Sequence, residues 1–324
     1  MFKIAIDLMG GDSSIYEPIK GVESFIKSNP KRNMYFYLVG PKNEISKNLN
    51  PNIFNNNYKI IDTDEIITMN DNPIKAIKEK PNSSMVRSLK LLKNNKVNAV
   101  ISSGNTGALI FSSTIIINKI NGVKKVILAP KIPNKHGNFI LADVGANIDI
   151  SPINFVNMAE LCAIYSKTIN NTDHPSIHLL NIGHEKSKGT PKLVEAFNHL
   201  SEKCTSFKGN IEARYLMDKK IDIVLCDGFV GNIVLKLIEG LSHYLLDTLK
   251  ESMEDETLYR VDNLKNIFDF QLSTILLGLN GIVLKCHGSS NYRAFQYAIQ
   301  EAHSLHKSML TKKITNHFAT KESK

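Results

Sequence analysis

The sequence has no tryptophan, only four cysteines among 324 residues, and only five arginines although its net charge is +9. The cysteines, Cys162, Cys204, Cys226 and Cys286, lie far apart, and three of them stand in apolar runs. That distribution favours reduced core residues over disulfides or a metal site. We therefore expect no bound metal.

The scarcity of arginine also bears on the class of partner. Arginine makes the bidentate contacts with phosphates and bases on which specific nucleic-acid recognition depends, and here the positive charge comes mainly from lysines spread along the chain. We expect no nucleic-acid partner. The positive net charge leaves open an acidic protein as a partner.

The chain lacks an unbroken apolar run of membrane length. The longest uncharged stretch, Val97 to Asn118, contains the polar break SSGNTG, which would leave irregular backbone in lipid. The beginning, MFKIAIDLMGGD, reaches an acidic residue at Asp7 without a long apolar core or a small-residue cleavage site, which argues against a signal peptide. We expect a globular protein that resides in the cytoplasm, with a hydrophobic content of 42% to form its core.

The most informative stretch that is present is Val97 to Leu109, VNAVISSGNTGAL. It predicts a buried strand that leads into a helix through two glycines three residues apart. Glycine lets the backbone turn sharply and approach a ligand closely, and the first N–H groups of a helix can bind an anion. The loop is neither a Walker loop nor a G-x-G-x-x-G motif, so it predicts an anion site at a strand-to-helix turn and nothing narrower. The alternative is an ordinary connection without a ligand.

Strands and helices alternate along the rest of the chain. The expected strands are residues 2–6, 34–39, 58–61, 97–101, 138–142, 177–182, 221–226 and 281–285. Most end in polar, glycine-containing loops, a pattern typical of a largely parallel sheet covered by helices, in which ligands bind beyond the carboxyl ends of the strands. We expect six of these loops to open on one edge and their polar residues to converge on one cleft.

The loops supply charged groups but no evident covalent nucleophile. The charged or titratable residues that stand out among them are Asp7, Asp12, Asp143, Glu185, Asp227, Lys188, Lys236 and His287. There is no G-x-S-x-G elbow and no cysteine in a loop, so a covalent nucleophile is not indicated. A site rich in N–H donors and cations suits an anionic substrate whose own oxygen reacts.

Eight segments of the sequence, taken together, resemble a known family. They are IDLMGGD (6–12), SSM (83–85), AVISSGNTGAL (99–109), LADVGAN (141–147), NIGHEKSKG (181–189), FKGNIEA (207–213), CDGFVGNIVLKLIEG (226–240) and LGLNGIVLKCHGSS (277–290). In this order they resemble the bacterial phosphate acyltransferases of phospholipid synthesis. The resemblance covers nearly the whole chain, whereas any one segment alone would be a weak signal.

The resemblance implies transfer of a fatty acyl group from the thioester of acyl carrier protein to inorganic phosphate. The acyl phosphate formed would serve a membrane glycerol-3-phosphate acyltransferase. It also implies a homodimer, no metal or dissociable cofactor, and a three-layer α/β/α fold similar to isocitrate-dehydrogenase-like and phosphotransacetylase proteins. We expect one catalytic domain over residues 1–306, with a helical hairpin protruding at about 233–270 and a Lys-rich, frayed tail at 307–324.

The resemblance and the loops together suggest roles for individual residues. Hydrogen phosphate would attack the thioester carbonyl, Lys188 and Lys236 would neutralise negative charge, and His287 would protonate the departing thiol. Asn232 completes the expected catalytic set. The expected phosphate- and substrate-binding residues are Asp7, Gly10, Gly11, Asp12, Ser103, Gly104, Asn105, Thr106, Asp143, Asn147, Glu185, Asp227 and Ser289.

Each of these residues also has a purely structural interpretation. The acids can cap helices or bind loop amides, the lysines can be solvated surface charges, and His287 can be a structural histidine. Asn105 and Asn232 can serve only to shape turns. For the whole protein, the alternatives are a nicotinamide-dependent dehydrogenase on the related fold and a non-catalytic binder of acyl carrier protein or of a membrane surface.

The expected hairpin carries an apolar stripe. Leu237, Leu241, Leu245 and Leu249 repeat every four residues, which is more typical of core or of a dimer interface than of a membrane anchor. A second helical segment, Leu258 to Phe268, adds further apolar residues beyond an acidic break. We expect the base of the hairpin to pack in the dimer and its tip to make weak peripheral contact with the membrane.

Overall fold

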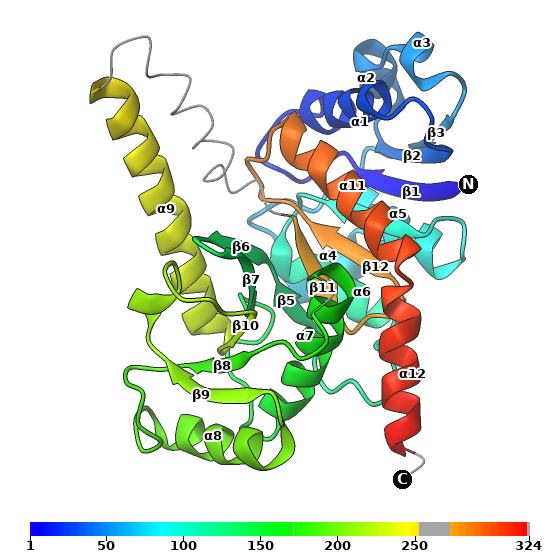
Figure 1. The fold of residues 1–324 in the computed structure, drawn as a ribbon. Helices are drawn as coiled ribbons and strands as arrows, with labels where there is room; N and C mark the ends of the chain where they lie inside the picture. Colours follow the sequence, from blue (N-terminus) through cyan, green and yellow to red (C-terminus); the bar gives the residue numbers. More distant parts are fainter. Residues whose placement is uncertain (171, 253–272, 323–324) are drawn as a thin grey trace. The chain divides into compact units, whose positions relative to one another are not determined.

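We analysed a computed structural model of the chain, which describes residues 1–170, 172–252 and 273–322 (Figure 1). The chain divides into two compact units. The first unit comprises Met1–Val126 together with Gln271–Lys324, and the second comprises Ile127–Phe270. The chain therefore leaves the first unit once and returns to it near its end.

The first unit contains a sheet in which strands from both of its chain segments are neighbours. Its strands are β1 (Phe2–Asp7), β2 (Met34–Gly40), β3 (Tyr58–Asp62), β4 (Ala99–Ser102), β11 (Thr274–Leu277) and β12 (Ile282–Lys285), in the order β3-β2-β1-β4-β12-β11. All neighbours are parallel except β11 and β12. The strands β1, β4 and β12 are buried on both faces along almost their whole length, as central parallel strands are.

The register of this sheet brings three strand ends to one level. Asp7, the last residue of β1, pairs with Ser102, the last residue of β4, and Ser102 pairs in turn with Lys285, the last residue of β12. The loops that follow these three strands therefore begin side by side at one edge of the sheet.

Eight helices of the first unit accompany this sheet among the described residues. They are α1 (Tyr16–Ser28), α2 (Lys42–Asn48), α3 (Pro51–Phe54), α4 (Pro73–Glu79), α5 (Ser84–Lys93), α6 (Thr106–Ile116), α11 (Tyr292–Lys307) and α12 (Leu310–Glu322). Helices α1 and α11 pack closely because Gly21 has no side chain: a Cβ there would lie 2.5 Å from Cβ of Phe295. Ser83 caps α5 by accepting a hydrogen bond from the N–H of Val86.

The second unit has its own mixed sheet. Its strands β6 (Lys131–Asn134), β7 (Gly137–Ala142), β8 (Ile177–Leu180), β9 (Phe207–Ile211) and β10 (Ile223–Leu225) lie in the order β6-β7-β10-β8-β9, and β5 (Ile127–Ala129) precedes them. Only β6 runs antiparallel to its neighbour. Leu225 pairs with Ala142 and with Leu179, so the loops after β7, β8 and β10 start at one edge of this sheet too.

Three α-helices and a 3-10 turn complete the described part of the second unit. They are α7 (Asn154–Asn170), α8 (Pro191–Lys203), α9 (Gly228–Ser252) and η1 (Ala213–Tyr215). Helix α7 is buried along one side by Phe155, Met158, Leu161, Cys162 and Tyr165, and it packs on β10. Helix α9 is the longest of the described helices and begins directly after β10 (Figure 1).

The end of the chain departs from the expectation of a frayed tail. Residues 310–322 form α12, and Leu310, Ile314 and Phe318 are each at most 3% exposed. These side chains repeat every four residues and so share one face of the helix. The expectation was wrong because it rested on the many lysines of the segment and not on the four-residue spacing of its three apolar side chains.

The α/β class expected from the sequence is confirmed, with helices flanking mixed, mainly parallel sheets. The strands are divided between two such sheets. The single catalytic domain over 1–306 stays a prediction. The second arm of the expected hairpin, Leu258 to Phe268, lies outside the described residues.

Candidate functional site

In the first unit, the loops after β1, β4 and β12 touch one another. A Cβ on Gly11 would lie 2.5 Å from Oγ of Ser103 and 3.2 Å from the carbonyl oxygen of Gly288, so the loops approach one another closely at this glycine. The N–H of Asp12 donates to the carbonyl of Gly288 at 2.8 Å, which joins the first loop to the third. Gly10, at φ +83°, provides the left-handed turn that this arrangement needs. The convergence of these three loops, expected from the sequence, is thus observed within the first unit.

A buried acid, Asp7, stabilises the loop after β4 through hydrogen bonds. Asp7 is 1% exposed, and its Oδ2 accepts a hydrogen bond of 2.6 Å from Oγ of Ser102. The same Oγ accepts the N–H of Gly104 at 3.1 Å, and Oδ1 of Asp7 accepts the N–H of Met9. Burial raises the pKa of Asp7 from 3.8 to about 6, and hydrogen bonds from Ser102 and Ser84 oppose that rise. The carboxyl therefore orders two loops without facing solvent.

A buried lysine lies beside the same loop. Lys285 is 8% exposed, and its Nζ donates to the carbonyl of Ser103 at 3.2 Å and to the carbonyl of Cys286. Its positive charge acts to lower the pKa of Asp7, although less than burial raises it. An ammonium group under a loop of backbone N–H groups and hydroxyls favours the binding of an anion there.

Helix α6 starts in this loop, and Asn105 is its N-cap. Its Oδ1 accepts the N–H of Ala108 at 3.0 Å, while its Nδ2 donates to three backbone carbonyls of residues 68–71. The side chain of Asn105 thus shapes the turn, which is the alternative the sequence left open. The first N–H groups of an 11-residue helix that begins at Thr106 remain the feature suited to a phosphate.

The third loop carries the expected general acid. His287 is exposed, and its Nδ1 lies 2.8 Å from Oγ of Ser289 and accepts the N–H of Ser289 at 3.3 Å. Because Nδ1 accepts that N–H, a neutral ring would carry its proton on Nε2. Asp12 is also exposed, at the loop that contacts Gly288. These side chains are accessible, in contrast to the buried Asp7 and Lys285.

In the second unit, Asp143 organises the loop after β7. Its side chain is fully buried; Oδ1 accepts the N–H groups of Leu128 and Ala146, and Oδ2 accepts the N–H and Nδ2 of Asn147. Burial raises the pKa of Asp143, and these hydrogen bonds, that from Asn147 foremost, oppose the rise. With both oxygens engaged in this way, Asp143 and Asn147 order the loop.

The start of α9 fits tightly against this loop. The N–H of Gly228 donates to the carbonyl of Asn147 at 2.8 Å, and a Cβ on Gly231 would lie only 1.9 Å from the carbonyl oxygen of Asp143. Asp227 accepts the N–H of Val230 at 2.8 Å and so caps the first turn. Asn232 is exposed and lies next to Gly145. The loops after β7 and β10 therefore meet at the N-terminus of a long helix.

The loop after β8 carries the expected catalytic lysine. Asn181 holds it closed, because its Nδ2 donates to the carbonyl of Lys188 at 3.0 Å and its Oδ1 accepts the N–H of Ile182. Lys188 and Glu185 are exposed on this loop, whose backbone is also tied to Asn210. The loop is thus ordered by backbone contacts while its charged side chains stay available.

Lys236, the second expected lysine, lies one turn further along α9 than Asn232. It is exposed, and its Nζ contacts Oε2 of Glu239 at 2.7 Å. The structure thus gathers the expected residues as two groups, one in each unit, and assigns no catalytic role. The first group is Asp7, Gly10, Gly11, Asp12, Ser103, Gly104, Asn105, Thr106, His287 and Ser289; the second is Asp143, Asn147, Glu185, Lys188, Asp227, Asn232 and Lys236.

Sequence reasoning missed Ser102, Lys285 and Asn181. Each stands at or just after the end of a strand, which is the signal that marked their neighbours. Lys285 ends an apolar run, and its burial beside Ser103 follows from the pairing of β12 with β4, a contact between residues 182 positions apart.

Within the described residues, no group of three or more His, Cys, Asp or Glu is arranged to hold a metal ion. The four cysteines are free, and Cys162, Cys226 and Cys286 are buried, as expected. One described helix segment, Gly228–Leu249 of α9, is long and apolar enough to cross a membrane by length and composition. Of the 18-residue stretch of this segment that meets the criterion, 17% is buried inside the protein. Its first turn packs against Asp143 and Asn147, as in a helix that belongs to a globular unit.

Comparison with known proteins identifies the family. The sequence model of a family described as "Fatty acid synthesis protein" matches residues 2–313. A phosphate acyltransferase of Clostridium acetobutylicum is 37% identical over 96% of this chain and 97% of its own length. The chain belongs to the phosphate acyltransferase family. It is therefore an acyltransferase, as the resemblance of its motifs implied.

Solved structures of other proteins share the fold. A phosphotransacetylase from Streptococcus pyogenes superposes with a TM-score of 0.60 at 15% identity, covering 94% of each chain. A 4-hydroxythreonine-4-phosphate dehydrogenase from Klebsiella pneumoniae gives 0.51 at 11% identity, covering 94% of this chain and 97% of its own. At such identities the likeness concerns the fold alone. For this phosphate acyltransferase family member, function rests on the sequence relatives and on the site.

Proposed function

We propose that the protein transfers a fatty acyl group from the thioester of acyl carrier protein to inorganic phosphate, giving acyl phosphate. The observation that carries this proposal is the match to phosphate acyltransferases along almost the whole chain. The loops at the strand ends support it, because they offer backbone N–H groups, a helix N-terminus and lysines to an anion.

In the proposed reaction, a phosphate oxygen attacks the thioester carbonyl directly. The loop from Ser103 to Thr106 and the region of Asn232 hold the phosphate, while Lys188 and Lys236 reduce the repulsion between the dianion and the developing oxyanion. The carbon–sulfur bond then breaks, and His287 gives its proton to the departing thiolate. Asp7 and Asp143 act indirectly, by holding the two loop systems in place.

The product of this reaction, an acyl phosphate, is a mixed anhydride that water can hydrolyse. An enzyme that uses the acyl phosphate should therefore lie close by. We propose that a membrane glycerol-3-phosphate acyltransferase uses it in phospholipid synthesis, and that the protein works in the cytoplasm as a homodimer with weak peripheral membrane contact. Sedimentation of the protein alone and its flotation with anionic vesicles test the last two statements. The expected tip of the hairpin lies outside the described residues.

The deciding experiment is an incubation of the protein with acyl carrier protein thioester and phosphate, followed by trapping with hydroxylamine. We expect acyl hydroxamate that depends on phosphate and persists after treatment with a chelator. Hydroxylamine also cleaves thioesters, so a control without phosphate sets the background.

Other outcomes would contradict the proposal. Binding of the thioester without phosphate-dependent product would favour a non-catalytic binder, and oxidation or reduction of a nicotinamide cofactor would favour the dehydrogenase alternative. Loss of activity with the chelator would contradict direct attack without a metal.

A further inference from the structure

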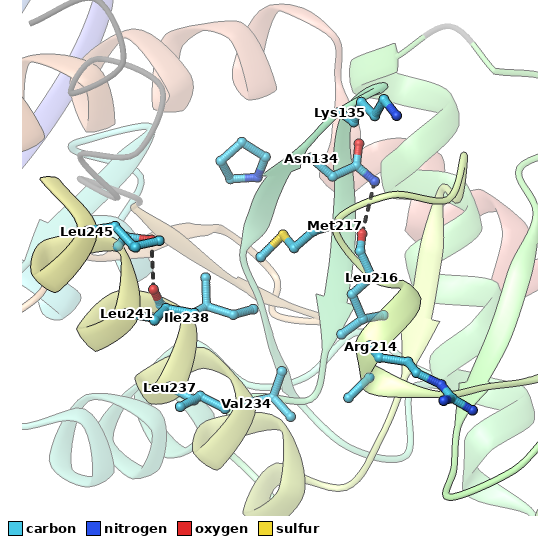
Figure 2. Close-up of a pocket in the computed structure, with 13 residues that line it drawn as sticks. Asn134, Lys135, Arg214, Leu216, Met217, Val234, Leu237, Ile238, Leu241 and Leu245 are labelled. Atoms are coloured by element: carbon cyan, nitrogen blue, oxygen red, sulfur yellow. Dashed lines mark hydrogen bonds between the residues drawn. The ribbon is translucent and has the colours of Figure 1, made fainter. Parts of the chain in front are cut away.

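The second unit contains an apolar groove that none of the roles described so far uses. It has a volume of about 660 Å³ and lies between α9 on one side and the end of β6 with the η1 turn on the other (Figure 2). The lining residues of α9 are Val234, Leu237, Ile238, Leu241, Ser242 and Leu245. Figure 2 shows Ile238 of α9 and Met217 on opposite walls. This volume is within the range of about 300–1,000 Å³ that small-molecule sites have.

The interior of the groove offers little to a polar ligand. Ser242 directs its hydroxyl to the carbonyl of Ile238 within α9, and Asn134 donates to the backbone of Leu216 (Figure 2). The two cations of the lining, Lys135 and Arg214, are each paired with an acid that is not part of the lining. An occupant would therefore be held by contact with apolar side chains.

These apolar side chains are accessible. Leu237 is 67% exposed and Leu241 is 51% exposed, which is unusual for leucines in one continuous surface. Burying them under a ligand would release water from a large apolar area, and this is the main source of affinity for an alkyl chain.

Helix α9 links the groove to the polar loops of its own unit. Its first turn contacts the loop after β7, where Gly231 packs against the carbonyl of Asp143, and the lining of the groove begins three residues further on, at Val234, and continues through Ile238 and Leu245. A ligand in the groove with its head toward the exposed Asn232 would have its tail among leucines. That polarity matches a fatty acyl group, whose carbonyl carbon reacts and whose chain is inert.

We infer that this groove binds the alkyl chain of the transferred acyl group. The inference rests on the proposed function and adds to it the site at which the protein distinguishes acyl chains of different length. From Val234 to Leu245 the helix advances about 16 Å, which an extended chain of about a dozen carbons spans. An octanoyl chain ends short of Leu245, whereas a hexadecanoyl chain passes it.

The absence of tryptophan from the chain allows a direct test. In Leu245→Trp the indole both fills the far end of the groove and is the only tryptophan. Tyr244→Trp is the matched control, because Tyr244 is the adjacent residue, is 66% exposed and does not line the groove. Thermal unfolding of both variants checks that they fold.

The first readout is the ratio of kcat/KM for hexadecanoyl thioester to kcat/KM for octanoyl thioester of acyl carrier protein. Each buried methylene contributes about fourfold in affinity, so loss of two methylene contacts in Leu245→Trp should lower the ratio by about fifteenfold. Tyr244→Trp should leave the ratio at the wild-type value. An unchanged ratio in folded Leu245→Trp overturns the inference.

The second readout needs no catalysis. We expect 12-bromododecylphosphonate, an analogue of the product with a quenching bromine at the end of its chain, to quench the tryptophan of Leu245→Trp and not that of Tyr244→Trp. Equal quenching of both, or none, overturns the inference. If the wild type makes no acyl phosphate, the proposed function fails while this binding experiment still tests the groove.

A second copy of the chain is the competing occupant. If Leu245→Trp changes the sedimentation coefficient and leaves both the ratio and the phosphonate binding at control values, the groove is an interface between copies. That result also overturns the inference.

Discussion

At the scale of single residues, Asp7 places an ionisable carboxyl inside the first unit where water cannot solvate it. The hydrogen bonds from Ser102 and Met9 compensate only in part, so the pKa stays raised, at about 6. Such a residue supports the adjacent loop at a cost in stability that depends on pH.

The direction of that dependence follows from the two pKa values. Below about pH 4 the carboxyl is protonated in the folded and unfolded states alike, and between about pH 4 and 6 it is protonated only in the folded state. The folded state then holds one more proton, so the contribution of Asp7 to the free energy of unfolding falls as the pH rises through this interval, by about 3 kcal/mol at most. Above about pH 6 it stays constant.

We predict that Asp7→Asn removes the pH-dependent contribution of this carboxyl to the free energy of unfolding. The free energy of unfolding of the wild type minus that of Asp7→Asn, measured by urea denaturation, should decline between pH 4 and 6 and level off above. A difference that is flat over this range would show that the carboxyl titrates alike in both states.

At the scale of elements, α12 shows how a short apolar stripe fixes a chain end. Phe318 lies against Gly122, where a Cβ would be 3.0 Å from that of the phenylalanine, and the φ of +81° at Gly122 also favours glycine. The helix is therefore part of the core of the first unit and not a solvated tail.

Removing that contact should be costly. We predict that Phe318→Ala lowers the free energy of unfolding by about 3–5 kcal/mol, as is typical when a buried aromatic side chain is truncated. Lys312→Ala, on the exposed side of the same helix, should change it by less than about 0.5 kcal/mol. Equal effects of the two substitutions in urea denaturation would mean that α12 does not stabilise the unit.

Most elements could be predicted from the sequence because their periodicity is strong. The strands β1 and β2 and the loop after β4 lie within a few residues of their expected places. The strands β5, β6, β9 and β11 were not predicted. In β9, whose sequence is FKGNI, lysine, glycine and asparagine interrupt the apolar pattern that marks the equally short strands β4 and β12.

At the scale of the whole molecule, alternation of strands and helices predicted the class but not the pairing of strands. Nothing local in Ile282–Lys285 shows that this strand returns to lie beside β4, and without that pairing the role of Lys285 cannot be inferred. For the same reason the sequence did not show how the strands divide between two sheets. The polar loops, by contrast, were found because each follows its strand directly in the sequence.

The chemistry of the whole molecule depends on whether the acyl group ever bonds to the protein. Cysteine is the side chain best suited to accept an acyl group from a thioester, but only as a thiolate. Burial raises the pKa of Cys286 to about 12 and holds that of Cys226 well above its usual value, and the pKa of the half-buried Cys204 is raised as well. None of these thiols is poised to react near neutral pH.

We therefore predict that no acyl-enzyme forms during turnover. The intact mass of the protein, measured after mixing with acyl carrier protein thioester in the absence of phosphate, should equal that of the untreated protein. The same mixture should give acyl phosphate once phosphate is added, which shows that the sample was active. A mass increase of one acyl group that disappears on adding phosphate would mean that a side chain of the protein, and not phosphate, attacks the thioester first.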